Sequence, residues 1–228
     1  MLHFYRAMNG YIPPETPDPD EFPVRGIDIS HYQGDIDWNI LSQEDHVQFA
    51  FIKATEGREH KDPKFLENWN AAQESDVFVG AYHFFTFGST GKEQAENFID
   101  TVPIADNVLP PVIDVEIYEA EVIPEKKDLQ KELDVMLDML ESHYGVKPII
   151  YTNSSTYISH LLGGYLKYDI WMSNLYCEPI INWTFWQYNF EGKLKGFAQE
   201  EIPVDLNVYN GNLDEFLSEF NLVYKKEN

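Results

Sequence analysis

The sequence predicts an α/β protein built as one closed barrel, with five β/α units followed by three strands. Short and nearly continuous apolar runs recur along the chain, as expected for strands that are buried on both faces. These runs occupy residues 24–30, 47–55, 77–85, 109–116, 147–153, 169–175, 184–190 and 204–210. Helical patterns separate the first five runs, whereas the later connections are short and rich in Gly, Pro and Asn. Eight strands fit a closed barrel, and the alternating units imply that most of them pair in parallel.

Local signals place several helices. Asp62 and Pro63 are predicted to be the N-cap and the first helical position of a helix over KFLENWNAAQES. Asp35 or Asp37 is expected to cap the first helix at Trp38, and LDEFLSEF is expected to form the closing helix. The clearest helix should start near Pro124 and stop at Gly145, because its apolar side chains form one stripe at helical spacing. That stripe consists of Leu129, Leu133, Met136, Leu137, Leu140 and Tyr144.

Residues 1–23 differ in composition from the rest and are predicted to form a proline-rich, acidic N-terminal arm or linker. They include the segment IPPETPDPDEFP. Proline fixes φ and removes a backbone donor, so this segment is expected to be extended. Residues 24–228 are assigned to the catalytic barrel domain.

Charge and composition exclude several functions. The chain of 228 residues carries 16 Lys and Arg against 39 Asp and Glu, a net charge of −23, which repels nucleic acids and anionic membranes. A single cysteine, Cys177, excludes a cysteine-based zinc cluster and an internal disulfide. No apolar run approaches the ~18 residues that span a bilayer. The first residues lack the apolar core of a signal peptide, so we expect either a cytoplasmic protein or one without its targeting segment.

Polar residues that end the apolar runs are the candidate site, because catalytic groups of a parallel barrel gather at the C-terminal ends of its strands. Asp114 and Glu116 are the sharpest pair. Residues i and i+2 of a strand face the same side with Cα atoms roughly 6.5 Å apart. Two carboxyl groups this close cannot both ionise easily, so one can stay protonated as a general acid beside a carboxylate.

Further acids and aromatic rings are expected around this pair. Asp28 and Asp205 end other predicted strands and complete an acidic pocket, in which a required metal ion is not expected. His31 and His83 are assigned to hydrogen-bonded packing. Aromatic rings with polar tips suit a sugar. The rings at or near strand ends include Tyr82, Tyr118, Tyr151 and Trp186.

Taken together, the motifs resemble glycoside hydrolase family 25 lysozymes, the N-acetylmuramidases of the Chalaropsis type. The segments that carry the resemblance, in order, are GIDISHYQGDIDW, FAFIKATEG, DPKFLENWNAA, VGAYHFF, LPPVIDVE, PIIYTN, WQYN and VDLNVYNG. They span roughly residues 24 to 212. The resemblance implies a TIM-like (β/α)5(β)3 barrel and cleavage of the β-1,4 bond between N-acetylmuramic acid and N-acetylglucosamine in peptidoglycan.

The resemblance also implies roles for residues. Glu116 is the proton donor, and Asp114 either orients the substrate's acetamido group or attacks the anomeric carbon itself. Asp28 and Asp205 match the two other acidic positions of the mouth. Tyr82, Tyr151 and Glu56 match further positions of the cleft. No cofactor is expected. In WMSNLY, Ser173 replaces the alanine found in many members.

Two other functions stay open from the sequence. A chitinase-like hydrolase also uses Asp-x-Glu on a barrel strand, although the fuller DxxDxDxE pattern is missing. A noncatalytic glycan-binding barrel is the second, and the presence of both Asp114 and Glu116 argues against it. The expected partner is the peptidoglycan glycan strand, bound by a monomer that is exported, associated with the cell envelope, or stored in the cytoplasm before phage-type release.

Overall fold

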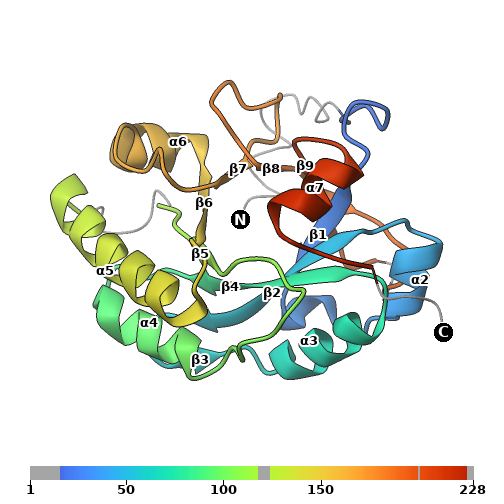
Figure 1. Cartoon of the computed structure of the whole chain (residues 1–228), viewed down its shortest axis with the longest axis horizontal. Helices are drawn as coiled ribbons and strands as arrows, with labels where there is room; N and C mark the ends of the chain where they lie inside the picture. Colours follow the sequence, from blue (N-terminus) through green and yellow to red (C-terminus); the bar gives the residue numbers. More distant parts are fainter. Residues whose placement is uncertain (1–15, 118–123, 200, 225–228) are drawn as a thin grey trace.

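The computed structural model describes residues 16–117, 124–199 and 201–224, and its sheet closes on itself (Figure 1). In this part of the chain, eight strands form the barrel. They are β1 (Arg25–Ile29), β2 (Phe49–Glu56), β4 (Phe78–Phe84), β5 (Val112–Asp114), β6 (Ile149–Asn153), β7 (Ile170–Ser173), β8 (Phe185–Gly192) and β9 (Val204–Tyr209). A short strand, β3 (His60–Lys61), pairs with the end of β2. All eight predicted strands are therefore present.

The barrel is mostly parallel, as predicted. Strand β1 pairs in parallel with β2, and the parallel ladder continues through β4, β5, β6, β7 and β8. Strand β9 closes the circle in antiparallel pairing with both β8 and β1. Because β9 runs the opposite way, the start of β9 lies at the same end of the barrel as the C-terminal ends of the other strands.

Helices cover the outside of the first five strands. They are α2 (Trp38–Gln43), α3 (Phe65–Glu74), α4 (Gly91–Ile99), α5 (Lys126–Tyr144) and α6 (Ser154–Thr156), which continues into a turn of π-helix, η2 (Tyr157–Leu161). A 3₁₀ turn, η1 (His31–Gln33), follows β1. Asp37 caps α2 by accepting the backbone N–H of Asn39 and Ile40, as expected. Gly145 ends α5 in the left-handed region with φ 73°.

One predicted helix start shifts and the other is confirmed. Helix α3 begins at Phe65, and Asp62 is not its N-cap, because its Oδ1 accepts the N–H of Lys64 in the preceding turn. The other Asp62 oxygen lies 2.7 Å from His31 Nδ1. Helix α5 begins at Lys126, after Pro124. The hydrogen-bonded packing role predicted for His83 is confirmed, since its buried ring lies 2.7 Å from Thr55 Oγ1. His31 has a hydrogen-bond partner, but its side chain is 29% exposed.

The closing helix, α7 (Leu213–Glu219), seals the N-terminal end of the barrel. Its fully buried Phe216 packs against Phe49 and Phe78, the first residues of two strands, with ring centroids 5.7 and 5.9 Å apart. Inside the barrel, the rings of Phe51 and Trp171 stack with their centroids 4.5 Å apart. Aromatic side chains thus fill one end, and the polar site can open only at the other.

The outside of β8 is covered without a long helix. Phe22, from within the predicted arm, is buried with its ring centroid 5.5 Å from that of Trp183 and 6.2 Å from that of Trp186. Pro17 is also buried. The part of the arm from Thr16 onward therefore contributes to the outer core, while residues 1–15 lie outside the described part of the chain.

Tight packing between α4 and α5, which lie side by side (Figure 1), gives a stability prediction. A Cβ at Gly91 would meet the backbone oxygen of Glu132 at 1.8 Å, so Gly91→Ala should force the helices apart and destabilise the fold by about 1–3 kcal/mol. Urea unfolding measures this. Gly88→Ala, where a Cβ meets nothing within 4 Å, is the matched control. Equal stability of both variants would contradict the packing described.

Candidate active site

The uppermost inward-facing side chains of the barrel form an acidic mouth at the C-terminal ends of the parallel strands. Partner residues on adjacent strands point to the same side, and Asp28 is paired with Asp205 in the register of β1 and β9. On the opposite wall, Asp114 is paired with Tyr151 in the register of β5 and β6. The structure therefore brings these predicted residues to one end of the barrel.

Asp28 is held by a fixed hydrogen-bond network. Its Oδ2 accepts Gln187 Nε2 at 2.9 Å and Asn207 Nδ2 at 2.8 Å. The orientation of each amide is set behind it, because Tyr151 Oη donates to Gln187 Oε1 at 2.9 Å and Trp171 Nε1 donates to Asn207 Oδ1 at 2.8 Å. Every member of the network is buried. Such a satisfied network holds the Asp28 carboxyl in one position.

Asp28 and Asp205 are adjacent carboxyl groups, and the pKa of each is raised. Burial is the main cause that raises the pKa of Asp28 to about 6, against the two amide donors that lower it. The pKa of half-buried Asp205 is raised further, to well above its usual range, first by burial and then by the charge of Asp28. Of the two carboxyl groups, Asp205 therefore holds a proton more readily than Asp28, as expected when two such groups are adjacent.

Asp114 ends β5 with its carboxyl group buried and incompletely satisfied. Only 8% of the residue is exposed, and Oδ1 has no hydrogen-bond partner among the described residues. Burial raises the pKa of Asp114 well above its usual range, and the nearby charges of Glu116 and Asp28 raise it further. A buried oxygen that lacks a donor is costly, so it marks a place where a ligand can supply the missing hydrogen bond.

Glu116 is positioned by the start of α6. Asn153 Nδ2 donates to Glu116 Oε1 at 3.0 Å, while Asn153 Oδ1 caps the helix by accepting the N–H of Thr156 at 2.9 Å. The capping bond fixes which end of the Asn153 amide faces the carboxylate. Thr156 Oγ1 also accepts the N–H of Ile117. The N–H of Val115, on the other side of Glu116, donates to Tyr151 O of β6, so the chain is anchored on both sides of Glu116.

The other predicted site residues take different places. Half-buried Tyr82 faces the mouth, where burial and the charges of Asp28 and Asp114 raise its pKa well above the usual value, so its hydroxyl stays protonated. Glu56, at the end of β2, accepts Lys53 Nζ at 2.7 Å. Trp186 is not in the mouth. It lies on the outer face of β8, 3% exposed, and its Nε1 donates to Asn174 O. Tyr118 lies outside the described residues.

Sequence reasoning missed Gln187, although a signal was present. In the run TFWQYNF the large rings of Phe185 and Trp186 dominate the pattern, and the alternation of strand residues places Gln187 on the same inward side as Phe185. A buried amide between apolar neighbours on a barrel strand is a candidate for holding a polar group in place. In the described part of the chain, no group of three or more His, Cys, Asp or Glu is arranged to hold a metal ion.

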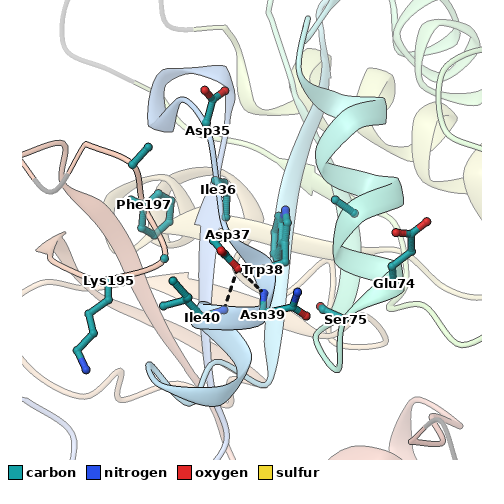
Figure 2. Close-up of a pocket in the computed structure, with 13 residues that line it drawn as sticks. Asp35, Ile36, Asp37, Trp38, Asn39, Ile40, Glu74, Ser75, Lys195 and Phe197 are labelled. Carbon is teal, nitrogen blue, oxygen red and sulfur yellow. Dashed lines mark hydrogen bonds between the residues drawn. The ribbon is translucent and has the colours of Figure 1, made fainter. Parts of the chain in front are cut away.

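A second hollow lies away from this chemistry. A groove of about 670 Å³ runs outside the barrel between α2, the end of α3 and the 195–198 loop (Figure 2). Three of its four charged residues are already engaged, since Asp37 caps α2, Asp35 pairs with Lys64 and Lys195 pairs with Glu44. None of the mouth acids lines it. We therefore place the active site at the mouth, where the perturbed carboxyl groups converge. No described helix is long and apolar enough to cross a membrane.

Comparison with known proteins agrees with this geometry. The solved structure of a family 25 glycosyl hydrolase from Bacillus anthracis superposes with a TM-score of 0.85 at 42% identity, covering 92% of this chain and 98% of that one. The bacterial lysozyme from Streptomyces coelicolor superposes with a TM-score of 0.78 at 28% identity, over 87% and 97% of the two chains. Lysozyme M1 of Streptomyces globisporus is 30% identical over 216 residues, which is 87% of this chain and 72% of that protein.

The model of the family described as Glycosyl hydrolases family 25 matches residues 27–197, a span that runs from within β1 to beyond β8 and includes Asp28, Asp114 and Glu116. This match covers well over half of the chain. The protein therefore belongs to glycosyl hydrolase family 25 and is a glycoside hydrolase, which confirms the family, the barrel fold and the enzyme class that the sequence predicted.

Proposed function

We propose that the protein is a lysozyme that cleaves the β-1,4 bond between N-acetylmuramic acid and N-acetylglucosamine in peptidoglycan. Family membership and the lysozymes among its relatives support this reaction. The observation that carries the mechanism is the unpartnered Oδ1 of Asp114, buried two residues from Glu116. An acetamido N–H of the substrate is a donor of the kind that this oxygen lacks.

The reaction proceeds with the substrate's own acetamido group as the nucleophile. Asp114 accepts a hydrogen bond from the acetamido N–H and turns its carbonyl oxygen towards the anomeric carbon. As that oxygen forms a bond to the carbon, the glycosidic bond breaks and Glu116 gives its proton to the leaving oxygen. Glu116 then removes a proton from water, which attacks the same carbon and opens the cyclic intermediate. Two displacements retain the anomeric configuration, as in other substrate-assisted glycosidases.

The remaining residues of the mouth hold the substrate and the acids. Tyr82 presents a protonated hydroxyl to the sugar, whereas Asp205 acts on the adjacent carboxyl group of Asp28. Tyr151 acts indirectly by holding Gln187 in place, since its hydroxyl donates a hydrogen bond to Gln187. The partner is the peptidoglycan glycan strand, which places the activity at the cell envelope. We expect a monomer to be sufficient, because all the acids described here come from one chain.

Removal of the proton donor is the first test of the mechanism. Glu116→Gln should lower kcat on purified peptidoglycan by at least about 100-fold, because a positioned general acid contributes about 10²–10⁴. Binding to insoluble peptidoglycan should be unchanged. Glu96→Gln, at an exposed position of α4 paired with Lys92, is the control and should keep full turnover. Turnover by Glu116→Gln close to that of the wild type would remove Glu116 as the acid.

The stereochemical course tests the role of Asp114. Proton NMR of the first product should show the β-anomer for the wild type, since two displacements retain configuration. Asp114→Asn replaces one acceptor oxygen with a donor and should lose most turnover on substrates that carry the acetamido group. An α-anomer as the first product would overturn substrate assistance and indicate direct attack by water.

The buried acids also predict how stability changes with pH. The carboxyl of Asp28 ionises near pH 4 when unfolded and at about 6 when folded, so the folded state binds more protons between these values. The stability contributed by this group is therefore full at acid pH and is lost as the pH rises through 6. Asp28→Asn keeps the amide contacts without titrating, so its melting temperature relative to wild type should rise between pH 5 and pH 8.

The control for this experiment is Asp138→Asn, at an exposed position of α5, which should shift the melting temperature equally at both pH values. A constant difference between Asp28→Asn and the wild type across this pH range would show that Asp28 titrates normally in the folded protein, against the burial described.

A further inference from the structure

A lysine lies inside the acidic mouth. Phe49 and Phe51 of β2 point into the barrel, where both pack against Phe185, so the alternation of the strand also directs Lys53 inward. Lys53 pairs with Tyr82 in the register of β2 and β4, which places it in the same layer as the acids. Its side chain is only 13% exposed. A buried cation among carboxyl groups calls for a functional reason, because burial disfavours its charge.

An irregularity in β2 fixes the ammonium group. The register with β4 shifts between Lys53 and Thr55, so one extra residue of β2 sits opposite β4 at this point. The bulge turns Thr55 outward, to His83, and brings Glu56 to the same side as Lys53, although three residues separate them. Glu56 Oε2 then accepts Lys53 Nζ at 2.7 Å. The ion pair is therefore a consequence of the bulge and not of regular strand alternation.

The same ammonium group reaches towards the strand that carries Asp114. Nζ lies 5.1 Å from the centroid of the Phe84 ring, and Phe84 is the register partner of Asp114 across β4 and β5. The carboxyl groups of Glu116, Asp28 and Glu56 face Asp114 and raise its pKa, whereas the charge of Lys53 lowers it. Tyr82 and Tyr151 also face Asp114, and both stay neutral at physiological pH.

We propose that Lys53 is a positioning residue whose ammonium group, held by Glu56, favours the carboxylate form of Asp114 in the enzyme–substrate complex, an inference that rests on the function proposed above. Substrate assistance needs two acids in opposite states. Asp114 must accept the acetamido hydrogen bond as a carboxylate, while Glu116 must hold a proton. Desolvation favours the protonated form of Asp114, and the positive charge of Lys53, which lies over the ring of the register partner Phe84, opposes that effect.

The test is the pH dependence of kcat/KM on soluble peptidoglycan fragments. Lys53→Gln should move the acid limb of the profile to higher pH by about one unit or more, the size of shift that an adjacent opposite charge produces. Activity at pH 5 should therefore fall at least about tenfold, and it should recover at higher pH. Lys53→Arg keeps the positive charge and should restore the wild-type limb.

Two comparisons separate this role from others. Lys92→Gln removes one exposed charge from α4 and so makes the same change in net charge; its profile should match the wild type. In an Asp114→Asn background, Lys53→Gln should leave the acid limb of the residual activity unmoved, because the group on which Lys53 acts is absent. Circular dichroism confirms that each variant is folded.

The outcomes are distinct. A Lys53→Gln profile with a lower plateau and an unmoved acid limb would overturn the proposal and assign Lys53 to packing alone. A wild-type enzyme that releases no new reducing ends from peptidoglycan would instead overturn the proposed function. A Lys53→Arg profile that resembles Lys53→Gln would also contradict the proposal, because the charge would then not be the property that matters.

Discussion

The removal of carboxyl groups from water at one end of a closed barrel is the constraint on which the rest of this structure depends. Asp28, Asp114 and Glu116 are each at most 9% exposed, and each would be more stable in water. The fold can hold them there because α7 and the aromatic interior close the opposite end, leaving one polar mouth. The same desolvation that weakens the fold sets the protonation states that a glycosidase needs.

The mouth has two halves with different chemistry. On one side, Asp28 receives two amide donors and lies beside Asp205, so this half is satisfied and rigid. On the other, Asp114 keeps an oxygen without a donor in the described structure. The antiparallel entry of β9 brings Asp205 to the first half, and the bulge in β2 brings the Lys53–Glu56 pair to the second. Departures from the regular parallel barrel thus supply the groups that tune the acids.

Much of the fold could be predicted from the sequence, because strands that are buried on both faces leave a continuous run of apolar residues. The acid pair could be predicted as well, because an Asp-x-Glu motif at the end of such a strand indicates a catalytic site. The exact start of α3 could not be predicted, because Asp62 is a residue type that often caps helices but here its carboxyl group contacts the His31 ring. Trp186 was predicted to bind the substrate, but Gln187 is the residue of this pair that faces the mouth. Which of two neighbouring residues faces inward depends on the register of β8. The Lys53–Glu56 pair depends on a bulge, which leaves no local pattern in the sequence.

The identity of the sugar at each newly formed reducing end tests the central claim most directly. Purified peptidoglycan is digested with the wild type and with Glu116→Gln in parallel, reduced with borohydride, and analysed by mass spectrometry. The account predicts muramitol ends, made by the wild type alone. Glucosaminitol ends would keep a glycoside hydrolase but contradict the assigned bond, and muramitol ends made equally by Glu116→Gln would contradict the role of this carboxyl group.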